Sequence, residues 1–506
     1  MAAAASADAA CRRSDGAGRS ELGRGSMMAQ RTTKSQVSGY RFLLRRLEHA
    51  LVRRDIRMIH DPMSGHVKSL IAGLVLTLVV VGGAVAFSIF KPQGSVGDST
   101  IVMSKQSGQL YVIVDGRLHP ALNLASARLV AGKAEKPNSV SDSVLAGYPR
   151  GAQLGIPGAP SDLSATGGPG LSIWSVCDRL DEPRDPDGTP TVGVVAGKPA
   201  PGLGARQLGG SDALYVRSGD EYFVVYRGTR AQIDPDDLVV RQALGLQSVQ
   251  ARSVSPALLD AIPPSRAIEA PRIPGAGDAS RFALDGARIG SILRVSSLDT
   301  GAGEQDQLYV VLSSGIQKVS PFVADLIRAA TPTSGQPITV SPGALTAIPQ
   351  VTSLDVDGYP DTAPDEVDGT AQKALCFRWS KDGDAEASTA VALEPDFPVA
   401  NEKSLLPTVG ARNDGLGADV TYVPPGTNYF VRTTGSSPGS DRAASDFLVA
   451  DTGVRYGVPD TAADDLGMPK PLTAPYPIVK LMPPGPALAR NSALVERSDV
   501  APDAGS

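Results

Sequence analysis

The sequence predicts a single-pass membrane protein with a short basic cytoplasmic segment and a large extracytoplasmic α+β part. Three observations predict this fold class. One apolar run at 70–90 carries no charge, Lys and Arg gather before it, and about 416 residues follow it. Gly and Pro make up nearly a fifth of the chain, against about an eighth on average. With short Val, Tyr and Phe runs between turns, this composition indicates several β-rich domains.

The run LIAGLVLTLVVVGGAVAFSIF at 70–90 has 21 residues. As a helix it would measure about 32 Å, close to the ~30 Å thickness of the hydrocarbon layer. A buried globular helix usually has a polar stripe, whereas only Thr77 and Ser88 interrupt this run. We predict an uncleaved transmembrane helix at 70–90, because some seventy residues precede it. Gly82 and Ala86 form a small-xxx-small pair that would let another helix pack closely.

The charge distribution orients this span. Residues 1–69 carry 13 Lys and Arg against 6 Asp and Glu, so this end has a charge of +7 and the remainder −12. Lys and Arg remain on the cytoplasmic side, so the N-terminus is expected in the cytoplasm and the C-terminal part outside it. The basic end suits anionic headgroups or an acidic partner, and the acidic remainder argues against nucleic acid.

The N-terminal part contains one predicted helix. Residues 1–30 have little to bury and are expected to be disordered. From Ser38 onward, leucines recur at three and four residues within the basic segment 31–69, which predicts an amphipathic helix. Such a helix lies on the inner leaflet or docks on a partner. The predicted docking residues are Arg45, Arg46, Leu47, Leu51, Arg53 and Arg54.

The cysteines fit this topology. Cys177 and Cys376 follow the span, where a disulfide can form and persist, whereas Cys11 precedes it. We expect the two outer cysteines to be paired, with two separate buried thiols as the alternative. Trp174 and Trp379 stand beside them in mirrored order. These features predict a central β domain built from 151–205 and 356–425 and closed by the disulfide.

A motif recurs in the outer part. VSPALLDAIP at 254–263 matches VSPGALTAIP at 340–349, and VSDSVLAGYP at 140–149 is a weaker copy. Each follows an apolar run that ends in a turn glycine, and a fourth such turn has no plain motif after it. Each unit is expected to be a β-hairpin followed by a helix, with too small a core to stand alone. The predicted repeats span 91–150, 206–270, 271–355 and 426–490, in a pseudo-twofold arrangement around the central domain, and a disordered tail spans 491–506.

Several stretches are characteristic: TTKSQVSGYRFLLRRLEHALVRRD at 32–55, FKPQG at 90–94, NLASARLV at 123–130 and VRYGVP at 454–459. From about residue 28 the chain resembles the EccB component of type VII (ESX) secretion systems. The resemblance implies a central β-barrel-like domain with four repeats, and a structural core subunit of the inner membrane that supports protein export. It also implies EccC-like motor ATPase, EccD-like and EccE-like partners, self-association, and contact with membrane lipids and the cell wall.

The residues offer little enzyme chemistry. His119 is the one histidine after the predicted span and is interpreted as a turn histidine. One imidazole and two paired cysteines cannot form a His/Cys zinc site, so none is expected. Asp178, Asp181 and Asp185 are interpreted as solvated acidic loop residues, with a glycosidase carboxylate pair as the alternative. EccB proteins are sometimes described as ATPases, but the best match to a P-loop, GVVAGKP at 193–199, is one residue short and lacks the hydroxyl. We predict no catalytic residue, metal or cofactor. The alternatives are an ATP-hydrolysing subunit that binds ATP, and a peptidoglycan-binding tether.

Overall fold

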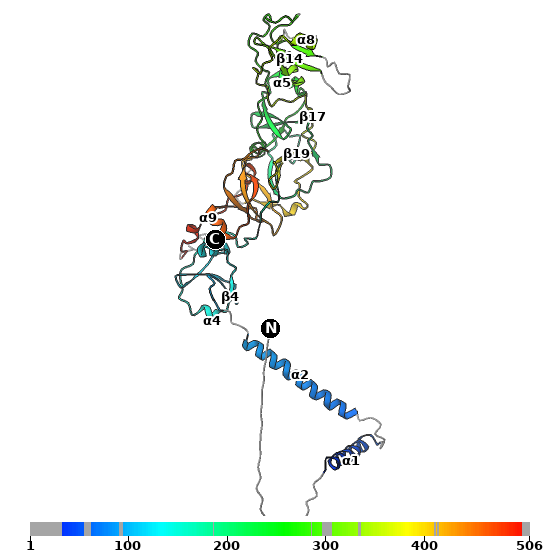
Figure 1. Ribbon diagram of the computed structural model, residues 1–506, viewed down its shortest axis with the longest axis vertical. Helices are drawn as coiled ribbons and strands as arrows, with labels where there is room; N and C mark the ends of the chain where they lie inside the picture. The colour runs from blue at the N-terminus through cyan, green and yellow to red at the C-terminus, as the bar shows by residue number, and fades with distance from the viewer. Residues whose placement is uncertain are drawn as a thin grey trace, which may run out of the picture. The chain divides into compact units, whose positions relative to one another are not determined.

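The computed structural model describes residues 33–54, 62–90, 95–185, 187–284, 286–295, 306–331, 335–408, 411 and 414–497. It divides the chain into two compact units, Met1–Pro92 and Gln93–Ser506. Each unit has its own elements, which Figure 1 colours from blue to red along the chain. The segment 1–30, predicted to be disordered, lies outside the described residues.

Helix α1 (Lys34–Arg53) begins four residues before the predicted start at Ser38. The cause is local, because the backbone N–H of Thr33 donates to Gln36 Oε1 at 3.0 Å and satisfies a donor at the helix start. At the other end, Arg54 adopts a left-handed conformation with φ 52°, and its N–H donates to the carbonyl of Ala50.

Helix α2 (Pro62–Phe90) has 29 residues and begins eight residues before the predicted span. Proline suits its first position, because the ring fixes a helical φ where no N–H partner is needed. A helix of this length measures about 43 Å, more than the ~30 Å of a hydrocarbon layer. Its segment Val67–Val85 is long and apolar enough to cross a membrane, and no part of it is buried. The hydroxyl of Thr77 donates to the carbonyl of Gly73 at 2.8 Å, so it needs no partner from outside the helix.

The second unit contains four small sheets with one topology, which we call modules 1 to 4. In each, three strands form a meander, a helix follows, and a fourth strand returns parallel to the first. Module 1 contains β1 (Ile101–Ser104), β2 (Leu110–Val114), β3 (Arg117–Pro120), α3 (Leu124–Ala131), β4 (Asn138–Val140) and α4 (Asp142–Leu145). Module 2 contains β9 (Asp212–Ser218), β10 (Glu221–Tyr226), β11 (Thr229–Ile233), α5 (Leu238–Ala243), β12 (Arg252–Ser253) and α6 (Pro256–Ala261). Module 3 contains β13 (Ile292–Val295), β14 (Gln307–Val311), β15 (Ile316–Val319), α7 (Pro321–Ala330), β16 (Ile338–Val340) and α8 (Pro342–Leu345). Module 4 contains β22 (Asn428–Thr434), β23 (Asp446–Val449), β24 (Arg455–Val458), α9 (Asp460–Leu466), β25 (Leu472–Pro475) and α10 (Tyr476–Val479).

The proline that ends the recurring motif has the same role in every module. Its carbonyl accepts the N–H of a residue at the outer edge of the meander, at distances of 2.8 to 3.0 Å. The accepting prolines are Pro149, Pro263, Pro349 and Pro483. The chain therefore covers an edge that would otherwise be open to pairing with another strand. Module 4 has this bond although its sequence, APYPIVKLMP at 474–483, scarcely matches the motif.

The turn between β10 and β11 requires glycine at Gly228. Its φ is +73°, and a Cβ there would lie 2.5 Å from Thr389 Oγ1 of the central sheet. We expect Gly228→Ala to lower the free energy of unfolding by about 2–3 kcal/mol, since a left-handed residue and a steric overlap both cost energy. Gly219→Ala is the matched control, because Gly219 has φ +59° but open space around it. Urea unfolding should show a clearly smaller loss for the control, and equal losses would contradict the packing argument.

The central sheet has seven strands in the order β20-β21-β7-β6-β18-β19-β8. Its elements are β6 (Leu171–Arg179), β7 (Thr191–Ala196), β8 (Arg206–Gln207), β18 (Ala374–Asp382), β19 (Ser388–Glu394), the 3-10 turn η1 (Glu402–Ser404), β20 (Leu406–Pro407) and β21 (Val420–Tyr422). Cys177 pairs with Cys376, and Trp174 with Trp379, on the antiparallel strands β6 and β18. The described strands form an open sheet with β20 and β8 at its edges, so the expected barrel-like domain is not found.

Short strands link the central sheet to its neighbours. β5 (Ala165–Thr166) precedes β6 and joins β22 of module 4, while β17 (Asp365–Val367) precedes β18 and joins β9 of module 2. Modules 1 and 4 share one hydrophobic core, and modules 2 and 3 share another. In Figure 1 the cyan module 1 accordingly lies beside the orange and red module 4. The first module of this unit thus packs against its last.

The predicted disordered tail is partly ordered. Helix α11 (Arg490–Ala493) packs against α3 of module 1, and Ala493 is fully buried. Further along, the backbone N–H of Arg497 donates to the carbonyl of Gln153 at 2.7 Å. The expectation of disorder from residue 491 is therefore wrong as far as residue 497, because this segment completes the core shared by modules 1 and 4. Residues 498–506 lie outside the described residues.

Candidate functional site

A buried carboxylate joins module 2 to the central sheet. Asp178, on β6, is fully buried. The backbone N–H of Ser255 donates to Asp178 Oδ2 at 2.5 Å, and the Ser255 hydroxyl donates to Oδ1 at 2.7 Å. The same hydroxyl accepts the N–H of Leu258 at 3.0 Å and so caps helix α6. The carboxylate therefore fixes the start of α6 against the sheet.

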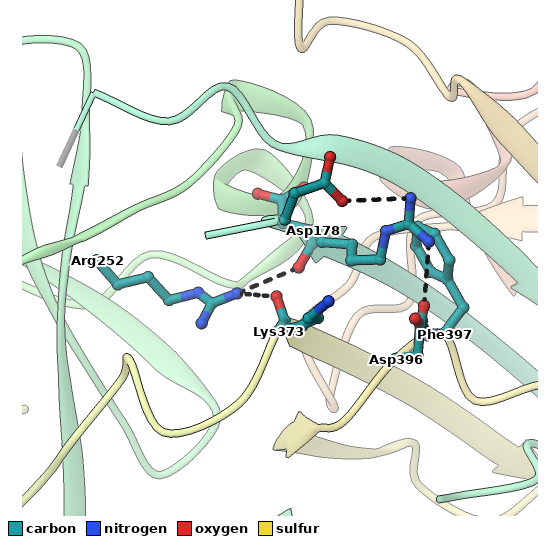
Figure 2. Close-up of polar contacts among 7 residues, drawn as sticks. Asp178, Arg252, Lys373, Asp396 and Phe397 are labelled. Carbon is teal, nitrogen blue, oxygen red and sulfur yellow. Dashed lines mark hydrogen bonds and ion pairs between the residues drawn. The ribbon is translucent and has the colours of Figure 1, made fainter. Parts of the chain in front are cut away.

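A buried arginine binds the same region from the other side. Arg252, on β12, is 1% exposed. Its Nη1 donates to the carbonyls of Gly369 and Gln372 at 2.5 and 2.7 Å. Its Nη2 donates to the carbonyl of Lys373 at 2.5 Å and to the backbone carbonyl of Asp178 at 3.5 Å, as Figure 2 shows. One guanidinium thus holds both β6 and the loop that leads into β18.

Burial dominates the electrostatics of this cluster. It raises the pKa of Asp178 to about 6, against the hydrogen bonds from Ser255 and the charge of Arg252, and the charge of Asp419 adds to the rise. Burial also lowers the pKa of Arg252 to about 10, against the charge of Asp178. Asp178 is therefore not the solvated loop residue expected from the sequence, whereas the Asp181 side chain is 85% exposed. The feature of the sequence that could have predicted the burial of Asp178 is its position in an apolar run, IWSVCDRL at 173–180.

Asp178 gives stability a defined pH dependence. Between its ordinary pKa of 3.8 and about 6, the folded chain binds more protons at this carboxyl than the unfolded chain does. Stability from this group is therefore greatest below pH 3.8, and about 3 kcal/mol is lost as the pH rises to 6. We expect the free energy of unfolding of the wild type to fall, relative to Asp178→Asn, across this window. Urea titrations at several pH values test this, and parallel pH profiles for the two proteins would contradict it.

The other face of β6 carries the disulfide. Cys177 and Cys376 are joined, as the sequence predicted, and are 0% and 1% exposed. Phe397 packs against them. Arg179 lies over the Phe397 ring, with 5.3 Å between the guanidinium carbon and the ring centre, and its Nη1 lies 3.4 Å from Asp396 Oδ1. Figure 2 shows Asp396 and Phe397 together on this side.

The stretch that resembles a P-loop forms a strand and a turn. Residues 191–196 are β7, and Gly193 pairs with Cys177 across the sheet. A Cβ at Gly193 would lie 2.4 Å from the Phe397 ring, so the glycine makes room for an aromatic side chain. Its backbone belongs to the sheet and does not form a loop around an anion.

His119 lies in strand β3 and not in a turn. It is 9% exposed, and its Nδ1 lies 2.8 Å from the carbonyl oxygen of Ala152. The sequence interpretation was therefore wrong in placement, because the turn falls before Arg117. Within the described ranges, no group of three or more His, Cys, Asp and Glu side chains is placed to hold a metal ion.

The predicted docking and packing residues lie on the exposed helices. Arg45 and Arg46 on α1, like Arg54 just after it, are exposed, and Leu47 and Leu51 are 63% and 75% exposed. The side chains of Arg53 and Ala86 lie outside the described residues. Among the described residues, no atom outside the local helix backbone lies within 4 Å of the position that a Cβ at Gly82 would take. Apolar surface of this extent indicates a lipid or protein contact.

Comparison with known proteins gives a consistent result. Residues 29–502 match the family described as "Type VII secretion system ESX-1, transport TM domain B". The chain is 36% identical over 486 residues to "ESX-5 secretion system ATPase EccB5" of Mycobacterium marinum, covering 93% of this chain and 95% of that protein. It is 36% identical over 485 residues to "ESX-3 secretion system ATPase EccB3" of Mycolicibacterium smegmatis, covering 92% and 91%.

Solved structures are similar over comparable lengths. A chain of an intact ESX-5 inner membrane complex superposes with a TM-score of 0.70 at 35% identity, covering 96% of this chain and 98% of that one. A chain from the structure of an EccB3 dimer of the ESX-3 core complex has a TM-score of 0.67 at 34% identity, covering 78% and 100%.

Proposed function

Because this chain belongs to the EccB family of type VII secretion systems, we propose that it is a structural subunit of an ESX inner-membrane complex that supports protein export. The observation that carries the proposal is the similarity, along 96% of the chain, to a subunit of an intact ESX-5 inner membrane complex. The exposed helices α1 and α2 agree with it, because such surfaces need lipid or protein around them.

The proposed topology places α1 in the cytoplasm and the second unit in the periplasm, with α2 as the single membrane span. The excess of Lys and Arg before α2 supports this orientation. Single cysteines at Gly39 and Ser107, in a Cys11→Ser background, test it with a membrane-impermeant maleimide on intact cells. We expect labelling at position 107 alone, and the buried disulfide does not interfere. Labelling at position 39 alone would overturn the orientation.

The proposed partners are EccC-like, EccD-like and EccE-like subunits, bound through α1 and α2, and further copies of the chain. The dimer described for EccB3 supports self-association. Deletion of 34–53 should reduce co-purification of the other subunits at least ten-fold, whereas a chain that starts at Met28 should retain them. The control removes only residues before the matched family region at 29–502. Equal retention by both variants would refute the docking role of α1, and absence of the other subunits from the wild-type preparation would refute membership of the complex.

ATP hydrolysis is the second candidate function, because relatives are named ATPases. We propose that energy comes from a motor subunit, since the best P-loop match belongs to β7 and packs against Phe397. ATP turnover should therefore fall to background when the chain is purified away from motor subunits. Turnover that persists through further purification would favour the ATPase. Binding of the full chain to insoluble peptidoglycan would instead favour a wall tether.

A further inference from the structure

Helix α1 presents an apolar stripe that the described part of the chain leaves uncovered. Its members recur at three and four residues, so they share one face of the helix. They are 40% to 75% exposed. The stripe consists of Val37, Tyr40, Leu44, Leu47 and Leu51, with Leu43 at its border. In proteins most of the stability of a helix comes from packing of its amphipathic face, so a surface that covers this stripe would stabilise α1.

The rest of α1 is mainly polar and basic, with two exposed apolar residues, Phe42 and Val52, outside the stripe. Its sequence contains five Lys and Arg and one acidic residue, Glu48. Arg41 and Arg46 are exposed and lie off the stripe. An apolar stripe opposite a face rich in arginine is the pattern of helices that lie in the interface of anionic membranes. Each basic residue close to such a surface adds attraction, so the charge of α1 complements anionic headgroups.

The chain keeps α1 near the bilayer. Only residues 55–61 lie between Arg54 and the start of α2, and seven extended residues reach at most about 25 Å. The apolar segment of α2 begins at Val67, five residues after Pro62. Lipid is therefore present at high effective concentration before any other subunit binds. This argument favours a membrane over a protein as the surface that covers the stripe.

We propose that α1 lies on the inner leaflet, with its apolar stripe inserted at the acyl-chain boundary and its arginines attracted to anionic phospholipids. The proposal rests on the cytoplasmic orientation argued above. It deepens the docking role of α1, because lipid then takes Leu47 and Leu51 while the arginine face stays available to a neighbouring subunit. Partner binding would thus begin from a helix already folded and oriented on the membrane.

The test uses the full chain, purified without other subunits and reconstituted into nanodiscs. One set of discs contains phosphatidylcholine alone, and the other contains phosphatidylglycerol and phosphatidylcholine at about 3:7. An NBD fluorophore is attached at Leu47→Cys or, as the matched control, at Ser38→Cys, both with Cys11→Ser. Ser38 is exposed and lies off the stripe, and replacing it removes no charge. Nitroxide-labelled lipid should quench the probe at position 47 strongly in anionic discs and the probe at position 38 weakly.

Charge variants test whether anionic headgroups attract the basic residues of α1. In the Leu47→Cys protein, each of Arg41→Gln and Arg46→Gln should lower the ratio of lipid-bound to free helix roughly five-fold. Glu48→Gln should raise it. Equal quenching at positions 38 and 47, no dependence on lipid charge, or shielding of position 47 only after other ESX subunits are added would each overturn the proposal. Co-purification of other ESX subunits is a separate experiment. The subunits can therefore co-purify with the chain even if α1 does not contact lipid, and the two proposals are tested independently.

Discussion

Replacing Arg252 by alanine is expected to lower the free energy of unfolding by about 3–5 kcal/mol, because each buried group left without a hydrogen-bond partner costs about 1–3 kcal/mol. The substitution leaves the carbonyls of Gly369, Gln372 and Lys373 without their donor. It also leaves Asp178 buried without a nearby cation, since Arg252 is the charge that favours its ionised form. Module 2 and the loop into β18 then lose the group that binds them together.

Tryptophan fluorescence during urea unfolding measures the loss of stability in the Arg252→Ala variant and reports on the central sheet. The chain has two tryptophans, Trp174 and Trp379, and both are buried in the central sheet. Arg217→Ala is the matched control, because Arg217 is also in module 2 but lies 3.1 Å from Asp187, whose side chain is 86% exposed. Surface ion pairs contribute at most about 1 kcal/mol. Losses of equal size in the two variants would show that the buried cluster does not hold module 2 on the sheet.

Removing the disulfide should cost a similar amount. Cys177 and Cys376 are 199 residues apart, and the chain-entropy argument gives about 5 kcal/mol as an upper figure for such a loop. We expect the double variant Cys177→Ala and Cys376→Ala to lose about 2–5 kcal/mol. The bridge links β6 to β18, so its loss lets the two halves of the central sheet separate more completely on unfolding.

Urea unfolding of the double variant, with Cys11→Ser as control, tests this effect. Cys11 precedes both helices of the first unit in the sequence, and its replacement should leave the unfolding midpoint unchanged. The native disulfide should also resist reductant until the chain unfolds, because both sulfurs are buried. An unchanged midpoint in the double variant, or rapid reduction of the folded protein, would contradict this account.

Features that depend on short stretches of sequence were predictable. The uncharged run at 70–90 was sufficient to predict a long apolar helix, and the structure has a helix whose segment Val67–Val85 is long and apolar enough to cross a membrane. The predicted topology put Cys177 and Cys376 on the same side of the membrane, which led to the prediction that they pair. The structure has a disulfide between them. The mirrored order of Trp174 and Trp379 corresponds to their direct pairing across β6 and β18.

Features that depend on distant contacts were missed. Asp178 looked like other acidic residues, because its burial results from Ser255 and Arg252, more than seventy residues away in sequence. The tail after residue 490 looked disordered because its partners belong to module 1. The openness of the central sheet depends on which strands form its edges, and no periodicity in the sequence specifies that.

The shared core of modules 1 and 4 has a consequence for biogenesis. During synthesis, α3 appears more than three hundred residues before α9, its packing partner. The apolar face of α3 in module 1 therefore stays unprotected until nearly the whole polypeptide has been synthesised. Closing so large a loop is slow and leaves time for aggregation. A truncated product would lack this closure, so chaperones and proteases would have exposed apolar surface by which to distinguish unfinished chains from complete ones.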